Sequence, residues 1–186
     1  MTPADAFPGL DTAAPIAGTV VVGLVIEVAI TWRFGWRPPF AAYSSLAVTG
    51  AILSATDLAA RRVPNPIVLS ACVLAVPLLV IASVSAGQWW PLARAGIAAV
   101  MLGGFYLALG LAFPAGMGLG DVKWAAILGA YLGWLAWSAV ITGTLLAFLA
   151  AAVVLVVMRV ARRPRASLPM VPFMTFGAVA AVLATR

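Results

Sequence analysis

Two aspartates stand where an apolar segment of the chain meets a polar connection. Asp57 ends one apolar segment within SATDLAARRVPNP, and Asp121 opens another within GMGLGDVK. Acidic side chains in such places are costly and often functional. The chain contains no histidine, which excludes serine–histidine and cysteine–histidine catalysis as well as histidine-bound zinc. Carboxylates are therefore its obvious acid–base groups.

Two carboxyl groups held close together have a definite chemistry, because both cannot ionise easily and one keeps a proton. The charged group can take a proton from water as that water attacks an amide carbonyl. The protonated group can hydrogen-bond the carbonyl oxygen and later help to protonate the leaving nitrogen. The alternative is that both aspartates are ordinary interfacial charges, paired with Arg61 or Arg62 and with Lys123.

The expected helix ends suggest which carboxyl group carries the charge. Asp121 lies at a helix amino terminus, where the macrodipole favours an anion, and Asp57 lies near a carboxyl terminus, where it does not. We therefore expect Asp121 to be the charged base and Asp57 the resting acid. Arg61, one turn beyond Asp57, argues for the opposite assignment.

Membrane helices are the elements that must position these aspartates. The 186 residues are 65% hydrophobic and 9% charged, with a mean hydropathy of +1.13, whereas soluble domains carry about a quarter charged residues. We expect an all-α, polytopic integral membrane bundle forming a single domain over residues 1–186, with about seven transmembrane helices and six to eight compatible with the pattern. The expected spans are about 14–31, 40–57, 66–86, 93–113, 121–137, 139–158 and 170–185.

Basic residues and tryptophans predict how the helices are oriented. Seven basic residues fall on one side of the membrane and four on the other, which places the connections 58–65, 114–120 and 159–169 in the cytoplasm. Both aspartates then reach the cytoplasmic face, the amino terminus is cytoplasmic and the carboxyl terminus is external. The net charge of +6 thus reflects topology and gives no indication of nucleic-acid binding. Six tryptophans fall on the external side as an interfacial belt, and Trp124 is the exception: Trp32, Trp36, Trp89, Trp90, Trp134 and Trp137.

Glycines surround Asp121 in a way that suits a peptide substrate. Gly116, Gly118 and Gly120 would let an extended strand approach and pair with bare backbone, although a plain flexible connection gives the same pattern. Gly129 and Gly133, at four-residue spacing, are interpreted as helix-packing residues.

The remaining polar groups give weaker signals. Asp5 and Asp11 belong to a solvated amino-terminal tail that has no basic residue, so we expect the first apolar segment to stay in the mature protein. For Glu27, near the external end of the first span, the alternatives are a buried functional carboxyl group and a structural side chain that snorkels to the interface, and the structural interpretation is favoured. A single cysteine, Cys72, supports no disulfide or thiolate metal site, and we expect no metal and no organic cofactor.

Three segments carry a resemblance to a known family: GLGDVKWAAILGAYLG (118–133), DLAARRVPNP (57–66) and LPMVPFMTFGAVAA (168–181). Their motifs and order resemble the prepilin peptidases, the type IV leader peptidases of the GxGD aspartic protease group. The resemblance implies that Asp57 and Asp121 form the catalytic pair and that Gly118, Gly120 and Lys123 support them.

It also implies a substrate and a location. The enzyme would cleave prepilin or pseudopilin precursors at the cytoplasmic face of the inner membrane, after a glycine that separates a short basic leader from an apolar helix. Larger members carry a cysteine-bearing cytoplasmic domain and methylate the new amino terminus. This chain has no cysteine or spare length between its first two spans, so it resembles the short, peptidase-only form associated with Flp-type pili.

Three other functions share parts of the pattern. A presenilin-like or signal-peptide-cleaving GxGD protease would share the chemistry but cut within a span, and the flanking RRVPN and the terminal prolines favour the prepilin peptidase over it. A small proton or ion carrier would use Asp57 and Asp121 as relay groups, but it needs polar groups across the bilayer, and the middles of the spans are almost wholly apolar. A serine–lysine hydrolase built on Lys123 lacks a nearby serine.

Overall fold

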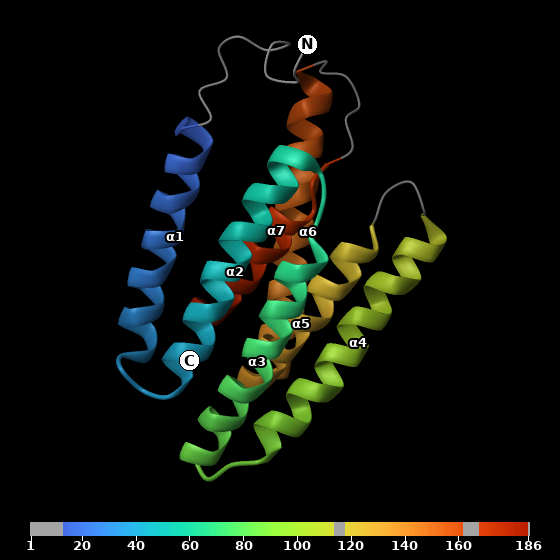
Figure 1. The fold of residues 1–186 in the computed structure, drawn as a ribbon. Coiled ribbons are helices and arrows are strands. Elements are labelled where there is room, and N and C mark those ends of the chain that lie inside the picture. The colour runs from blue at the N-terminus through green and yellow to red at the C-terminus, as the bar shows by residue number, and fades with distance from the viewer. Residues whose placement is uncertain (1–12, 114–117, 162–167, 186) are drawn as a thin grey trace.

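The structure, a computed structural model, describes residues 13–113, 118–161 and 168–185. Within these ranges it contains seven α-helices and no strand, and each predicted span overlaps one helix (Figure 1). The predicted all-α fold is therefore confirmed. Asp5, Asp11, Gly116, Arg162, Arg163, Arg165 and Arg186 lie outside the described residues. The helices are α1 (Ala13–Phe34), α2 (Pro39–Ala60), α3 (Asn65–Ser85), α4 (Trp90–Ala112), α5 (Leu119–Leu135), α6 (Trp137–Val160) and α7 (Val171–Ala184).

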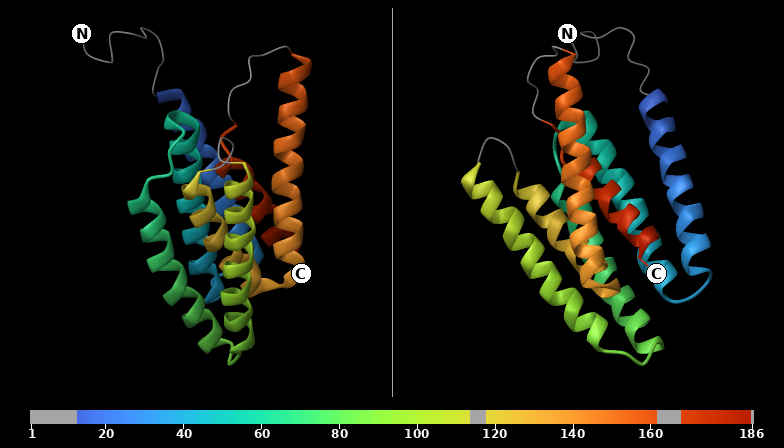
Figure 2. Two further views of the ribbon diagram at one scale, coloured as in Figure 1. Left: turned by 90° about the vertical axis from the view of Figure 1, so that its right-hand side faces the viewer. Right: turned by 180° about the vertical axis from the view of Figure 1, so that it is seen from behind.

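The helices alternate in direction through the bundle (Figures 1 and 2). The last turns of α2, α4 and α6 gather at one end with the first turns of α3, α5 and α7, and we call this the aspartate end. The opposite end, the tryptophan end, carries the turns from α1 to α2, from α3 to α4 and from α5 to α6. Asp57 and Asp121 thus reach the same end, as the alternation of spans predicted.

The outer surface of the bundle is apolar. By length and composition, α3, α4 and α6 are each able to cross a membrane. Large apolar side chains such as Val73, Leu145 and Leu149 are more than half exposed on these helices. A continuous surface of this kind suits contact with lipid and not with water. The protein is a helical membrane bundle.

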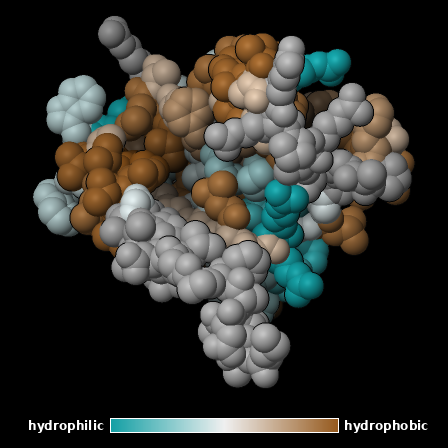
Figure 3. Space-filling model, turned by 90° about the horizontal axis from the view of Figure 1, so that it is seen from above, coloured by the Kyte–Doolittle hydropathy of each residue, from teal (hydrophilic) through white to brown (hydrophobic). Residues whose placement is uncertain are grey.

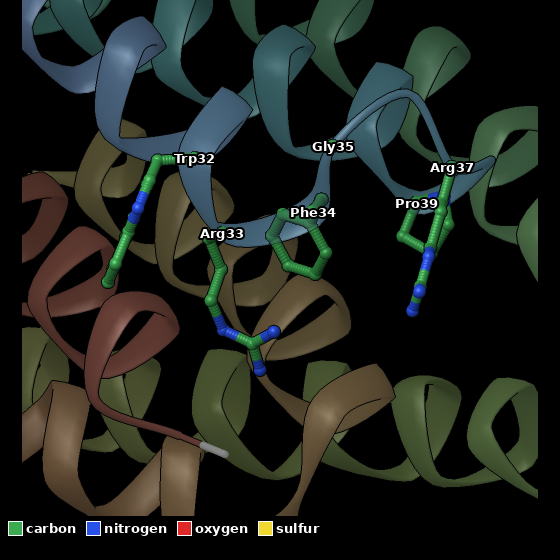
Figure 4. A pocket seen from close by; sticks show the side chains of 6 residues that line it. All are labelled: Trp32, Arg33, Phe34, Gly35, Arg37 and Pro39. Atoms are coloured by element: carbon green, nitrogen blue, oxygen red, sulfur yellow. The ribbon is translucent and has the colours of Figure 1, made fainter.

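The tryptophan end collects the six tryptophans of the predicted belt. Trp32 and Trp36 are almost fully exposed beside the turn from α1 to α2, and Trp89 and Trp90 are exposed at the turn from α3 to α4. This end also holds a cavity of about 350 Å³ (Figure 4). Because the cavity lies at the end of the bundle away from the aspartates, it does not belong to their site. Its lining residues are Trp32, Arg33, Phe34, Gly35, Arg37 and Pro39.

Helix α5 lies at the centre of the bundle and packs against α3, α4, α6 and α7, whereas α2 packs against α1, α3 and α7. Gly129 and Gly133 contact the backbone of α4 around Ala98, which confirms the packing role predicted for them. One buried core draws residues from all seven helices. The two helices that carry the aspartates touch towards the tryptophan end, where the Tyr43 hydroxyl of α2 donates a 2.8 Å hydrogen bond to the carbonyl oxygen of Tyr131 on α5. Helices α3 and α7 pack against both.

Differences in helix length set the starts of α5 and α7 back from the end of α6. Helix α5 has 17 residues and α7 has 14, whereas α6 has 24. Only Ala136 separates α5 from α6 at the tryptophan end. With a rise of about 1.5 Å per residue, α6 therefore extends roughly 10 Å farther than α5. Figure 2 shows α6 rising beyond the starts of α5 and α7.

Glu27 has a different environment from the predicted one. Its side chain is turned towards α2, where the hydroxyl of Ser44 donates a 2.7 Å hydrogen bond to Oε2. Its Oε1 atom is buried and has no hydrogen-bond partner in the described part of the chain. The carboxyl group therefore links α1 to α2 and does not snorkel, while the structural role predicted for it agrees with this contact.

Candidate active site

Asp57 is positioned by the last turn of α2. The helix ends because Arg61 adopts a left-handed conformation (φ 50°, ψ 39°), and the N–H of Arg61 donates to the carbonyl oxygen of Asp57 at 2.9 Å. Pro64 then holds the connection extended before α3 begins. This geometry leaves the Asp57 side chain only 6% exposed, directed into the bundle.

The first turn of α7 receives the Asp57 carboxylate. The backbone N–H of Val171 donates to Oδ2 of Asp57 at 3.1 Å. The first N–H groups of a helix have no acceptor within the helix, so this bond satisfies a free donor and a buried carboxylate at once. It joins two residues that lie 114 positions apart in the chain.

Asp121 is positioned by the first turn of α5. Gly118 precedes the helix in an extended conformation, and its N–H donates to Oδ2 of Asp121 at 3.0 Å. The N–H of Asp121 in turn donates to the carbonyl oxygen of Gly118 at 3.1 Å. This reciprocal pair closes the helix start and leaves the Asp121 side chain partly buried.

The two carboxyl groups are near each other at the aspartate end. They are close enough to repel electrostatically, but no hydrogen bond joins them directly. The guanidinium of Arg61 attracts Asp57, and the buried phenol of Tyr106 on α4 interacts electrostatically with Asp121. The structure thus brings together the two acids that the sequence singled out, from helices far apart in the chain.

The surroundings of Asp57 change the argument about which carboxyl group carries the charge. Asp57 lies near the carboxyl end of its own helix, but it also caps the amino end of α7 through Val171. Both carboxylates therefore face a helix amino terminus, where the macrodipole favours an anion. Helix ends no longer distinguish them, and the assignment of Asp121 as base and Asp57 as acid stays a prediction.

Two of the predicted supporting residues, Gly120 and Lys123, hold the start of α5 against the segment between α2 and α3 and the first residue of α3. Gly120 packs on Val63 so tightly that a Cβ atom at Gly120 would lie 2.5 Å from the Val63 Cβ. The ammonium group of Lys123 donates a 2.9 Å hydrogen bond to Oδ1 of Asn65. Lys123 therefore does not pair with Asp121, and it links two of the three segments on which the family resemblance depends.

Sequence reasoning missed a second set of polar residues near the aspartates. The indole N–H of Trp124 and the hydroxyl of Ser54 both contact the hydroxyl oxygen of Thr175 on α7. Trp124 gave a signal in the sequence, because it is the one tryptophan outside the predicted belt. Its side chain is fully buried.

Among the described residues visible from the aspartate end, hydrophilic residues form separate patches beside apolar ones (Figure 3). In the described part of the chain, no three histidine, cysteine, aspartate or glutamate side chains are grouped so that they could hold a metal ion. What these residues offer chemically is a carboxyl pair, partly shielded from water and held by backbone donors.

Comparison with known proteins places this site within a family. A family model described as the type IV leader peptidase family matches residues 44–157, which is more than half of the chain and includes both aspartates. The segment 168–181, with Val171 and Thr175, lies outside the match. Comparisons with curated proteins and with solved structures gave no significant match. The chain belongs to the type IV leader peptidase family.

Proposed function

We propose that this protein is an aspartic endopeptidase that removes the short basic leader from prepilin or pseudopilin precursors, using Asp57 and Asp121 at the cytoplasmic face of the inner membrane. The observation that supports this most strongly is the meeting of two carboxylates at one end of the bundle. Each accepts a hydrogen bond from a backbone N–H at the start of a helix. The family match supports leader peptidase activity in general.

The proposed reaction is the hydrolysis of one peptide bond by water. Asp121, as the base, takes a proton from the water while its oxygen bonds to the carbonyl carbon of the substrate. Asp57, as the acid, hydrogen-bonds the carbonyl oxygen and stabilises the tetrahedral intermediate. The C–N bond then breaks, and the leaving nitrogen receives a proton from the carboxyl pair. The products are a free carboxyl group and a free amine.

The geometry of the aspartate end suits a precursor that lies in the membrane. Such a precursor presents an apolar helix to lipid and a polar leader to water, so its cleavage site lies at the boundary. The start of α5, set back from the end of α6, would bring that boundary to the two carboxylates. Gly118, which is exposed, would offer backbone to an extended substrate segment. Because no cysteine-bearing domain is expected, we propose peptidase activity without methyltransferase activity.

The test is cleavage of a co-expressed Flp-type prepilin by the wild type and by Asp57→Asn and Asp121→Asn. We expect the wild type to shorten the precursor, and each variant to lose activity by about 100-fold or more, because acid–base groups contribute at least that much. Glu27→Gln is the matched control, because it removes a third carboxyl group that contacts Ser44 away from the site. It should cleave like the wild type.

Three results would contradict the proposal. Cleavage by both asparagine variants at the wild-type rate would exclude the two-aspartate mechanism. Absence of cleavage by the wild type, with several prepilins and confirmed membrane insertion, would favour the carrier instead, and proton flux into vesicles would then be measured. A cut inside the apolar helix of the precursor would indicate the presenilin-like alternative.

A further inference from the structure

A single hydroxyl group joins three helices close to the aspartates. Oγ1 of Thr175 on α7 accepts a hydrogen bond from the indole N–H of Trp124 on α5 at 3.2 Å, and it lies 3.4 Å from the hydroxyl of Ser54 on α2. Trp124 is fully buried and Thr175 is 5% exposed. We call Ser54, Trp124 and Thr175 the three-helix cluster.

The three-helix cluster lies one helical turn from the proposed catalytic groups on every helix. Trp124 follows Asp121 by three residues, and Ser54 precedes Asp57 by three residues. Thr175 follows Val171, whose N–H binds Asp57, by four residues. Residues three or four apart lie on the same face of a helix, about 5 Å from each other along its axis. The cluster therefore lies directly below the carboxyl pair, towards the middle of the membrane.

The packing of the bundle gives this cluster a mechanical role. The hydrogen bonds that join α2 directly to α5, from Tyr43 and Ser45 to Tyr131, lie towards the tryptophan end. The distance between the two carboxyl groups therefore depends on what joins these helices near the aspartates. Helix α7 packs against both α2 and α5, and its Thr175 hydroxyl contacts Ser54 on α2 and Trp124 on α5. The contact is tight, since a Cβ atom at Gly50 on α2 would lie 2.5 Å from Cγ2 of Thr175 and 3.4 Å from the Trp124 ring.

We propose that the three-helix cluster is a positioning device that fixes the separation of the Asp57 and Asp121 carboxyl groups, with the Thr175 hydroxyl as its centre. This inference rests on the proposed peptidase function. The separation matters because two carboxyl groups share a proton only while they repel each other strongly. Reaction rates also fall steeply when reacting groups are misplaced by an ångström.

The test compares Thr175→Val, which keeps the shape but removes the hydroxyl, with Thr175→Ser, which keeps the hydroxyl. We expect Thr175→Val to lower kcat about tenfold or more with little change in KM. The acidic and alkaline limbs of its pH–rate profile report the two pKa values of the carboxyl pair. These limbs should move closer together, because weaker repulsion between the carboxyl groups makes the two pKa values more alike. Thr175→Ser should retain most of the wild-type kcat and the wild-type pH profile.

Ser83→Ala provides the matched control. Ser83 on α3 accepts a 2.8 Å hydrogen bond from the indole N–H of Trp134 on α5. The control therefore removes a hydrogen bond between a hydroxyl group and a tryptophan of α5, as Thr175→Val does, but at the tryptophan end. It should leave kcat and the pH profile unchanged. If Thr175→Val matches Ser83→Ala in both readouts while the wild type cleaves, the positioning role is refuted and the peptidase proposal stands.

A second measurement keeps the inference testable if the wild type does not cleave. Spin labels attached to Ala60→Cys and Leu119→Cys, in a Cys72→Ser background, report the distance between the end of α2 and the start of α5. Both positions are exposed. We expect Thr175→Val to broaden the distance distribution and Ser83→Ala to leave it unchanged. Identical distributions in all variants would overturn the inference, whatever the activity of the wild type.

Discussion

At the scale of single residues, the two glycines before Asp121 have different reasons to be glycine. Gly120 lies against Val63, and an added Cβ would be 2.5 Å from the Val63 Cβ. Gly118 has φ −88° and ψ 156°, an extended conformation open to any residue. Among the described residues, the nearest atom to a Cβ added there is Oδ2 of Asp121 at 3.7 Å, which is an ordinary contact. The described part of the protein therefore gives Gly118 no steric reason to lack a side chain.

We therefore predict opposite effects of alanine at these two positions. Gly120→Ala should destabilise the fold by about 1–3 kcal/mol through overpacking, measured as the midpoint of unfolding in a denaturing-detergent titration. Gly118→Ala should keep wild-type stability but raise KM for a prepilin by about tenfold or more, because its methyl group blocks the approach of the substrate backbone.

The comparison of stability with KM separates folding from substrate contact. Gly118→Ala with wild-type KM would show that the substrate does not approach this glycine, and the substrate-binding role predicted for it would then be dropped. A loss of stability in Gly118→Ala equal to that in Gly120→Ala would mean that both glycines serve packing alone.

At the scale of helices, Arg94 determines how α5 ends. Its guanidinium donates to the carbonyl oxygens of Gly133, Trp134 and Leu135 at 2.5, 2.6 and 2.6 Å. The last carbonyl groups of a helix have no donor within the helix, and here an arginine from α4 supplies three hydrogen bonds to them. Helix α5 is thus fixed at both ends, by Asp121 at its start and by Arg94 at its finish.

We predict that Arg94→Gln lowers stability by about 1–3 kcal/mol, the usual cost of leaving buried acceptors without donors. Arg94→Lys should not restore it fully, because an ammonium group lacks the planar fork of a guanidinium. Unfolding midpoints in detergent measure the effect. Arg37→Gln, which changes an exposed arginine at the same end, should match the wild type. Equal midpoints for Arg94→Gln and Arg37→Gln would show that the cap contributes nothing.

The helices were predictable from sequence because apolar runs of membrane length have few alternatives, but their starts were less so. The sequence places the start of the fourth span at about residue 93, after Pro91. Helix α4 begins at Trp90, with Pro91 inside its first turn, where a missing N–H costs nothing. Pro66 occupies the same position in α3 and Pro172 in α7. A proline thus marks a helix start more accurately than it marks a gap.

The two aspartates of the candidate site were predictable from the sequence, but the contacts that hold them in place were not. Asp57 and Asp121 stood out because acids are rare in apolar sequence, and alternation of spans placed them at one end. Nothing local to Val171 or Thr175 reveals that α7 lies between the two aspartate helices. Such contacts depend on which helix faces meet across 114 and 51 positions of the chain, and one sequence does not contain that information.

At the scale of the whole molecule, orientation in the membrane decides where the reaction takes place. Arg61, Arg62 and Lys123 lie at the aspartate end with Arg159, whereas Arg33, Arg37 and Arg94 lie at the tryptophan end. With the basic residues beyond the described ranges, the bias is seven to four in the sequence. Cytoplasmic connections carry the excess of basic residues, so the aspartate end should face the cytoplasm, where the leader of the proposed substrate would lie.

This orientation predicts the accessibility of two single cysteines in a Cys72→Ser background. Gln88→Cys lies in the turn from α3 to α4, Arg62→Cys lies in the connection after α2, and both positions are exposed. A membrane-impermeant maleimide added to intact spheroplasts should label position 88 and not position 62. Lysis should make both reactive, which serves as the internal control. Labelling of position 62 alone in intact cells would place the carboxyl pair outside the cell. That result would leave the chemistry of the pair intact but would exclude a substrate whose leader stays in the cytoplasm. The predicted location is therefore tested separately from the proposed mechanism.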